Sequence, residues 1–374
     1  MTTLAAATKR LLSRLHDPTV AVDAEFIVAP TSMEEAAEIL NAAAAVGQAV
    51  AFYGAGTHRQ IGNPVDADLV ITTTAMNRII DYQPDDLTVA VEPGVTLGEL
   101  GAALTDRNLT AVLPETEPNA TVGGVVAAGR SGYRRLRYGP TRDRVLQATA
   151  ATGYGKVVTG GSPVVKASTG YGMPRLLTGS FGTLGLIGPV LLKLWSQPRA
   201  AATVFVDDAE VARNVAYRPL AVLGTGGNAR VYLGGTREEV DAQVEAIGGR
   251  SSDGLDWPEP HDPPLRLSFR IPARFVDEAV VVARDLDATD WVAQYGVGIV
   301  EAGYDRITSD GFSAARAWAE SVGGTLVIEA SPSDLRRKLG AWGSPPDSVD
   351  LQREVKDRFD PAGICNPGIL PGGI

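Results

Sequence analysis

Residues 50–62 of the chain read VAFYGAGTHRQIG. The first four residues favour a short strand, and the run stops abruptly at Gly54-Ala55-Gly56. Small residues at this point let backbone N–H groups point into a concavity, which is a geometry that suits a pyrophosphate. The glycine spacing differs from the dinucleotide-binding fingerprint, and no long helical pattern follows it. Taken alone, the loop can equally be a tight structural turn.

Two further glycine-rich loops follow. Residues 114–124 read PETEPNATVGG, in which two prolines stiffen the approach to Thr121-Val122-Gly123-Gly124. Residues 178–188 read TGSFGTLGLIG, in which glycines punctuate a short apolar run. Small residues permit close backbone contact with a ligand. Taken alone, the loop at 114–124 can be a helix start packed on a sheet, and the loop at 178–188 can be a β-bend.

The sequence around these loops predicts a mixed α/β chain in two parts. Residues 26–28, 49–53, 69–72 and 87–91 favour strands, and helices are expected after Thr31 and Thr96, which have capping-box spacing to Glu34 and Glu99. Glycine density falls near residue 198. Residues 199–345 then alternate helical and strand patterns, which predicts an antiparallel sheet backed by helices.

Composition excludes several functions. A formal net charge of −10 argues against nucleic acid. The basic stretch at 130–144 is local, and is either a solvated loop or a patch near an anionic cofactor or substrate. One cysteine and three scattered histidines cannot hold an iron–sulfur cluster, and we expect no metal site. No apolar run is long enough to span a bilayer, so we expect a cytoplasmic protein, or one held peripherally to a membrane through a complex.

The order and spacing of the three loops resemble the FAD-binding pattern of the vanillyl-alcohol oxidase and p-cresol methylhydroxylase superfamily. RYG at 137–139, DRVL at 143–146 and VKASTGY at 165–171 also resemble family segments. The resemblance covers about residues 25–198. It implies an α+β fold, with an FAD-binding domain of two subdomains at 1–198. A smaller α+β domain would span 199–374, with about 350–374 returning to the flavin.

Within the superfamily, the chain is similar to the accessory FAD-binding subunit of bacterial glycolate oxidase complexes. The ending KDRFDPAGICNPG at 356–368 and the double-arginine stretch at 129–143 carry this similarity. By resemblance, the first two loops would hold the FAD pyrophosphate, the third would follow the adenosine half, and Asn366 would reach the flavin ring. The implied cofactor-binding residues are Gly54, Ala55, Gly56, Thr57, His58, Gly62, Pro114, Thr121, Val122, Gly123, Gly124, Gly179, Gly182, Gly185, Ile187 and Asn366.

The chain departs from relatives that oxidise 2-hydroxy acids by themselves. Those relatives carry an HxGDGNxH-like segment, whereas the only histidine here after His58 is His261, in a proline-rich loop. Lys166 and Tyr171 are the candidate catalytic residues, as cation and hydroxyl near a flavin face, although both can be structural. Arg266 and Arg270 alternate on an expected strand, as carboxylate receptors or as part of a solvated face.

His58 and Cys365 could anchor FAD covalently, but His58 fits a hydrogen-bonding or packing role better, and Cys365 fits a small packed position better. We therefore expect a subunit that carries FAD in a glycolate or D-lactate oxidase or dehydrogenase complex. Electrons would pass to an iron–sulfur partner, and a related flavoprotein subunit would carry the catalysis. The alternatives are a self-sufficient FAD-dependent dehydrogenase or oxidase of a hydroxy acid or alcohol, and a flavin-free scaffold. Turnover by the isolated chain would identify the self-sufficient enzyme. A chain that stays colourless after incubation with FAD would identify the scaffold.

Overall fold

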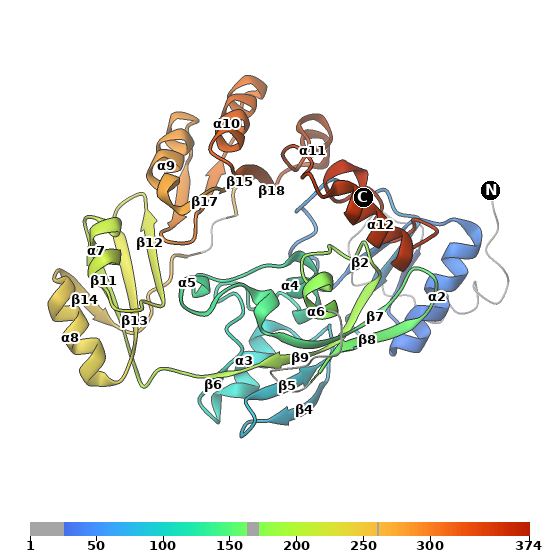
Figure 1. The fold of residues 1–374 in the computed structure, drawn as a ribbon, viewed down its shortest axis with the longest axis horizontal. Coiled ribbons are helices and arrows are strands. Elements are labelled where there is room, and N and C mark those ends of the chain that lie inside the picture. The colour runs from blue at the N-terminus through green and yellow to red at the C-terminus, as the bar shows by residue number, and fades with distance from the viewer. Residues whose placement is uncertain (1–25, 163–171, 260–261) are drawn as a thin grey trace.

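The computed structural model describes residues 26–162, 172–259 and 262–374 (Figure 1). The chain begins with a small parallel sheet of order β1-β3-β2, formed by β1 (Phe26–Val28), β3 (Leu69–Thr72) and β2 (Val50–Tyr53). Helix α2 (Met33–Val46) packs one apolar face on this layer, and Gly47 ends it with a left-handed φ of 68°. Ser32 caps the helix by accepting from the Glu35 N–H at 3.1 Å. The expected cap at Thr31 is therefore wrong by one residue, because the Thr31 hydroxyl donates to the Glu35 carboxylate instead.

The second layer is a five-stranded antiparallel sheet of order β4-β5-β9-β7-β8. Its strands are β4 (Ile79–Gln83), β5 (Thr88–Val91), β9 (Leu186–Lys193), β7 (Val145–Ala151) and β8 (Val157–Gly161). The main helices against it are α3 (Leu97–Thr105), α4 (Val122–Ala128) and α6 (Met173–Leu177). The expected Thr96–Glu99 capping box at the start of α3 is confirmed. The short ribbon of β6 (Leu109–Thr110) and β10 (Trp195–Ser196), helix α5 (Arg135–Tyr138) and the 3-10 turn η1 (Thr141–Asp143) complete this part.

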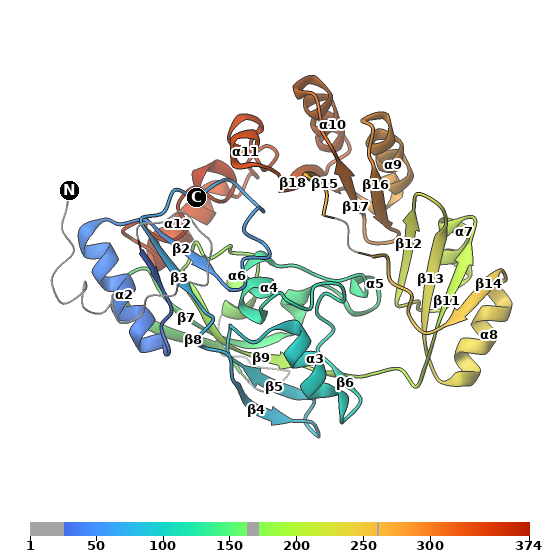
Figure 2. The same ribbon diagram turned by 180° about the vertical axis from the view of Figure 1, so that it is seen from behind.

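The third layer is an eight-stranded sheet of order β14-β11-β13-β12-β16-β17-β15-β18, in which every neighbouring pair is antiparallel. Its strands are β11 (Ala200–Val206), β12 (Ala221–Thr225), β13 (Ala229–Gly235), β14 (Arg250–Asp253), β15 (Leu265–Arg270), β16 (Asp290–Gln294), β17 (Ile299–Tyr304) and β18 (Thr325–Ala330). Helices α7 (Ala209–Val215), α8 (Arg237–Ile247), α9 (Val276–Asp285) and α10 (Ser309–Ser321), with the 3-10 turn η2 (Ala273–Phe275), accompany these strands. Figure 2 shows the four helices on the side of the sheet that is away from α4 and α5.

Strand alternation decides what the opposite face of this sheet presents. On β15, Leu265, Leu267 and Phe269 are buried in the core shared with the helices. Since side chains alternate between the two faces of a strand, Arg266 and Arg270 belong to the other face. The part of the sheet around β15 therefore presents polar side chains toward α4 and α5, and this arrangement positions the site described below (Figures 1 and 2).

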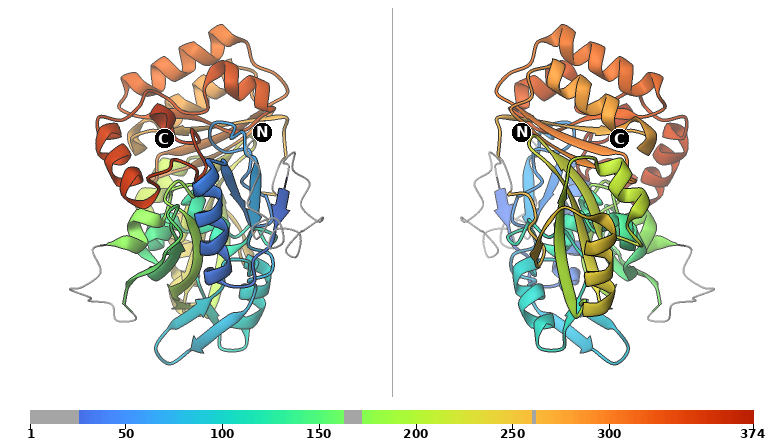
Figure 3. Two further views of the ribbon diagram at one scale, coloured as in Figure 1. Left: turned by 90° about the vertical axis from the view of Figure 1, so that its right-hand side faces the viewer. Right: turned by 90° about the vertical axis from the view of Figure 1, so that its left-hand side faces the viewer.

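The C-terminal segment returns to the first layer after α11 (Ser333–Leu339) and α12 (Val349–Phe359), and it ends in the 3-10 turn η3 (Pro371–Gly373). The red C-terminal helix α12 and the blue helix α2 lie on the same side of the molecule (Figures 1 and 3). Val50 pairs in parallel with Cys365, and the Val50 N–H donates to the Ile364 carbonyl at 2.8 Å. The buried Lys356 ammonium donates to Asp360 at 2.8 Å and to the Cys365 carbonyl at 3.0 Å. These contacts secure the returning segment.

The expected α+β class with an antiparallel sheet in its later part is confirmed. The eight-stranded sheet starts at Ala200, beside the boundary expected at residue 199, while the division into domains itself stays a prediction. The strands expected at 26–28, 49–53, 69–72 and 87–91 are found as β1, β2, β3 and β5, each within one residue of the expected bounds.

Candidate functional site

The three glycine-rich loops meet in one cavity of about 850 Å³. Its wall includes residues 54–59, Thr121, Gly123, Gly124, Gly182, Gly185, Ile187 and Asn366. Most of the predicted cofactor residues thus come together, although up to 312 positions separate them along the chain. Strand β2 ends at Tyr53 and delivers the first loop, α4 starts beyond Thr121, and the third loop leads into β9. Phe52, Tyr53, Phe181 and Ile369 also line the cavity, and no sequence signal identified them.

Close backbone packing explains the small residues around this cavity. A Cβ on Gly54 would collide with the Thr121 side chain, and a Cβ on Gly182 would lie 2.7 Å from the Asn366 amide nitrogen. Thr121 itself accepts from the Gly124 N–H at 3.3 Å. The glycines therefore let the three loops approach one another closely around the cavity. A space lined by backbone and small residues of three loops suits a ligand with a pyrophosphate, such as FAD.

Four of the predicted residues do not line the cavity. Val122 is fully buried in the core of the five-stranded sheet, and the Gly179 N–H donates to the Val126 carbonyl at 2.9 Å. Gly62 has a φ of 87° and its carbonyl accepts from Arg336 at 3.0 Å. Pro114 packs behind the double-arginine stretch, where a Cβ on Gly132 would lie 2.9 Å from its Cα. Their contribution would be to shape the loops.

Asn366 joins the C-terminal segment to two of the cavity-forming elements. Its side-chain oxygen accepts from the Phe52 N–H at 3.1 Å, and its amide nitrogen donates to the Phe181 carbonyl at 2.5 Å. The residue adopts a φ of 39°, which asparagine tolerates better than most residues. Its neighbour Cys365 is buried in the first core, as expected for a small packed position. Burial, together with Asp360, raises the pKa of the Cys365 thiol well above its ordinary value.

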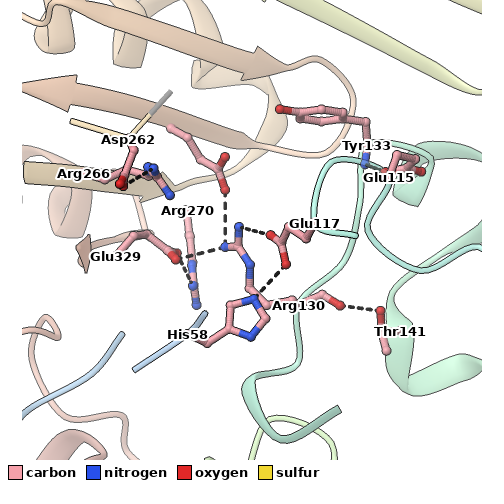
Figure 4. A network of polar contacts seen from close by, with 11 residues as sticks. His58, Glu115, Glu117, Arg130, Tyr133, Thr141, Asp262, Arg266, Arg270 and Glu329 are labelled. Atoms are coloured by element: carbon pink, nitrogen blue, oxygen red, sulfur yellow. Dashed lines mark hydrogen bonds and ion pairs between the residues drawn. The ribbon is translucent and has the colours of Figure 1, made fainter. Parts of the chain in front are cut away.

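A charged network starts at the edge of the cavity (Figure 4). His58 Nε2 lies 2.8 Å from Glu117 Oε2, so the hydrogen-bonding role expected for His58 is seen. Glu117 Oε1 accepts from Arg130 Nη2 at 3.2 Å, and Arg130 Nη1 donates to Glu329 Oε2 at 2.9 Å. Glu301 Oε1 lies 3.4 Å from the same nitrogen. We call Arg130, Glu117, Glu301 and Glu329 the arginine hub, which links α4 and the second loop to β17 and β18.

The surroundings of the hub shift the pKa values of its members in different directions. Burial would raise the pKa of Glu117, but the hydrogen bond from His58 and the charge of Arg130 outweigh it and hold this pKa at about 2. Burial and the charge of Glu329 raise the pKa of Glu301, against the opposing effect of Arg130. For Glu329, Arg130 and Arg270 outweigh burial and lower the pKa. The hub therefore holds two firmly ionised carboxylates and one, Glu301, that retains its proton more readily.

The basic stretch at 130–144 is not a solvated loop, so that interpretation is wrong. The side chain of Arg130 is 18 % exposed. Arg134 donates to Glu115 at 2.6 Å, and Arg144 is 1 % exposed and lies over the Trp195 ring. Arg270 is also part of an ion pair, since its guanidinium donates to Glu329 at 2.8 Å. Arg266 lies 3.6 Å from Asp262 and lines two cavities beside the hub.

The candidate catalytic residues Lys166 and Tyr171, like His261, lie outside the described residues. Their assignment stays a prediction. Sequence reasoning missed the carboxylates Glu117, Glu301 and Glu329, because each stands alone in an ordinary strand or loop pattern. Within residues 26–162, 172–259 and 262–374, no group of three metal-binding side chains comes together. Over the same residues, no helix is both long and apolar enough to cross a bilayer.

Comparisons with known proteins agree with this geometry. The family described as FAD binding domain matches residues 24–161. An uncharacterised FAD-linked oxidoreductase of Mycobacterium tuberculosis is 32 % identical over 92 % of this chain and 90 % of its own length. The glycolate oxidase subunit GlcE of Escherichia coli is 27 % identical over 84 % of this chain and 90 % of its own. The structure of an alkyldihydroxyacetonephosphate synthase superposes with a TM-score of 0.64 at 16 % identity, over 92 % of this chain and 77 % of that one, which shows a shared fold.

Proposed function

Because this chain belongs to the FAD-linked oxidoreductases, we propose that it carries FAD in a glycolate or D-lactate oxidase or dehydrogenase complex and passes electrons to a separate iron–sulfur subunit. The likeness to a glycolate oxidase subunit over most of both chains supports this substrate class. A single cysteine supports the separate electron carrier, since a cluster needs several thiolates. A related flavoprotein subunit would complete the complex.

The observation that carries this proposal is the convergence of three loops and Asn366 on one cavity. Residues 54–58 and 121–124 would hold the pyrophosphate of FAD, and the third loop would follow its adenosine half. Asn366, fixed by Phe52 and Phe181, would orient the flavin end. When bound, FAD supplies the acceptor for the hydride equivalent, while the protein binds, orients and excludes water.

The arginine hub would serve as the polar wall beside the cofactor. Glu117 holds the His58 ring at the first loop, and Arg130 fixes Glu117 relative to the eight-stranded sheet. Glu301 combines a raised pKa with a place on the wall of two cavities. Once ionised, a carboxyl group with a raised pKa is a stronger base than an ordinary carboxylate, which suits it to accept a proton from a substrate hydroxyl. Glu301 would therefore be the proton acceptor.

One observation favours the alternative that the chain oxidises a substrate without a related catalytic subunit. A cavity of about 1340 Å³ beside the hub is lined by Arg130, Arg266 and Glu301, so cations and a proton acceptor already face one space within this chain. In that case the related flavoprotein subunit would not be needed for turnover.

The visible spectrum of the purified chain tests both possibilities. A flavin spectrum that bleaches on anaerobic addition of glycolate or D-lactate would establish self-sufficient oxidation. A flavin spectrum that stays oxidised until the partner subunits are added would support the subunit proposal. A colourless chain that takes up no FAD, or a flavin that neither acid reduces even in the assembled complex, would overturn the proposal.

A further inference from the structure

Two arginines face one cavity behind the arginine hub. This cavity, of about 800 Å³, lies between residues 128–135 and the polar face of the eight-stranded sheet. Arg135 enters it from α5 and Arg270 from β15. Ala128 lines both this cavity and the predicted FAD cavity, so the two spaces adjoin.

The guanidinium groups of Arg135 and Arg270 differ in how far nearby carboxylates neutralise their charge. Arg270 is paired with Glu329 at 2.8 Å. Within the described part of the chain, Arg135 has no carboxylate within ion-pairing distance. Burial, and then the positive charge of Arg270, lower the pKa of Arg135, which shows that the pair repel each other in a partly enclosed space. An anion placed between them would relieve this repulsion.

A buried amide points to a second feature of the ligand. Gln294 is 4 % exposed and lines the same cavity, yet its side-chain oxygen has no hydrogen-bond partner among the described residues. A buried hydrogen-bond acceptor without a donor is destabilising, so a ligand that donates a hydrogen bond to the Gln294 oxygen would be favoured here.

Sheet register places Gln294 and Arg270 together. Gln294 on β16 pairs with Ile299 on β17, and Ile299 pairs with Arg270 on β15, so the three residues form one row across adjacent strands. Glu301 lies two positions along β17 from Ile299, on the same face. An anion at the two arginines would therefore have Gln294 and Glu301 as neighbours.

We propose that this cavity, formed by Arg135, Arg270 and Gln294, binds a small hydroxy-carboxylate directly on this chain. The carboxylate would lie between the guanidinium groups, and the hydroxyl would donate to Gln294. Fork-shaped guanidinium groups suit carboxylate geometry, and one hydroxyl donor would satisfy the unpaired amide oxygen. This assignment rests on the proposed function for its substrate class, and it deepens that function by placing the hydroxy acid in this subunit.

Binding can be separated from oxidation with a substrate analogue. The probe is 2-hydroxyisobutyrate, which has the hydroxyl and the carboxylate but no hydrogen on the carbinol carbon, so a flavin cannot oxidise it. Isothermal titration calorimetry on the FAD-loaded chain should detect binding of this probe. Isobutyrate, which lacks the hydroxyl, should bind about tenfold more weakly. The uncharged 2-hydroxyisobutyramide and inorganic phosphate should give no saturable binding.

Arg135→Gln is the decisive variant, because among the described residues Arg135 takes part in no ion pair that the substitution would break. It should weaken binding of the probe at least tenfold, since hydrogen bonds to charged groups carry that much affinity. Arg142→Gln is the matched control: it removes the same charge from an exposed position nearby and should leave affinity within twofold. The ratio of flavin to protein absorbance should be equal in all three chains.

The outcomes distinguish this assignment from the proposed function. If glycolate or D-lactate reduces the flavin but Arg135→Gln leaves probe affinity unchanged, the assigned cavity is wrong and the function stands. If the probe binds and responds to Arg135→Gln but neither acid ever reduces the flavin in the assembled complex, the function fails and the cavity stands. Equal affinity for isobutyrate or phosphate would overturn the assignment to hydroxy-carboxylates.

Discussion

Removing the charge of Glu117 tests the arginine hub most directly. Glu117→Gln keeps the shape of the side chain and leaves Arg130 with two of its three carboxylates. It also removes the partner that holds the His58 ring. The substitution should therefore destabilise the fold in a way that depends on pH.

The pKa of Glu117 sets the size of the effect. His58 and Arg130 outweigh burial and lower this pKa from 4.5 to about 2. One pKa unit corresponds to about 1.4 kcal/mol, so ionised Glu117 contributes about 3 kcal/mol to the free energy of unfolding. Because the folded pKa lies below the unfolded one, this contribution is present above about pH 4.5 and is lost as the pH falls toward 2.

Urea unfolding of the FAD-free chain, followed by circular dichroism from pH 7 to pH 3, measures this dependence. We expect Glu117→Gln to cost about 3 kcal/mol at pH 7 and about half of that at pH 3. Glu210→Gln is the control, because Glu210 forms an exposed helix ion pair worth less than about 1 kcal/mol. A cost below about 1 kcal/mol at pH 7, or a cost that does not shrink toward pH 3, would refute the reasoning.

Three further predictions concern the elements around the cavity. Lys356→Met should lower the free energy of unfolding by about 3–5 kcal/mol in the same urea experiment, because it leaves a buried carboxylate unpaired. Gly54→Ala should weaken FAD retention after gel filtration at least tenfold, because the new Cβ collides with Thr121, whereas Gly101→Ala meets nothing within 4 Å and should retain FAD. Cys365 should not react with a disulfide reagent such as dithionitrobenzoate at pH 8 while the chain is folded, because burial raises the pKa of its thiol. The same thiol should react fully in urea. Rapid reaction of the folded chain would show that the C-terminal segment opens.

Local sequence identified the loops because their chemistry is local. At Gly56, for example, the left-handed φ of 75° favours glycine because of the backbone turn itself. The Thr96–Glu99 capping box is likewise set by neighbours within one helical turn. The resemblance of these loops to the FAD-binding pattern of the superfamily implied the residues of the cavity wall and the α+β class.

Charge pairing could not be anticipated in the same way. In the sequence, Arg130 belonged to a basic stretch that was either a solvated loop or a patch near an anionic ligand, because nothing near it shows that three carboxylates would surround it. Two of them, Glu301 and Glu329, reach it only through the register of strands 171 and 199 positions further along the chain.

The sequence by itself determined the three glycine-rich loops and the lack of enough cysteines for a cluster, and its two-part organisation stays a prediction. Tertiary structure alone decided that Arg130 is buried among carboxylates and that Arg135 and Arg270 face one cavity with Gln294. The physical reason is that backbone conformation depends on adjacent residues, whereas electrostatic pairing depends on which distant strands the fold brings side by side.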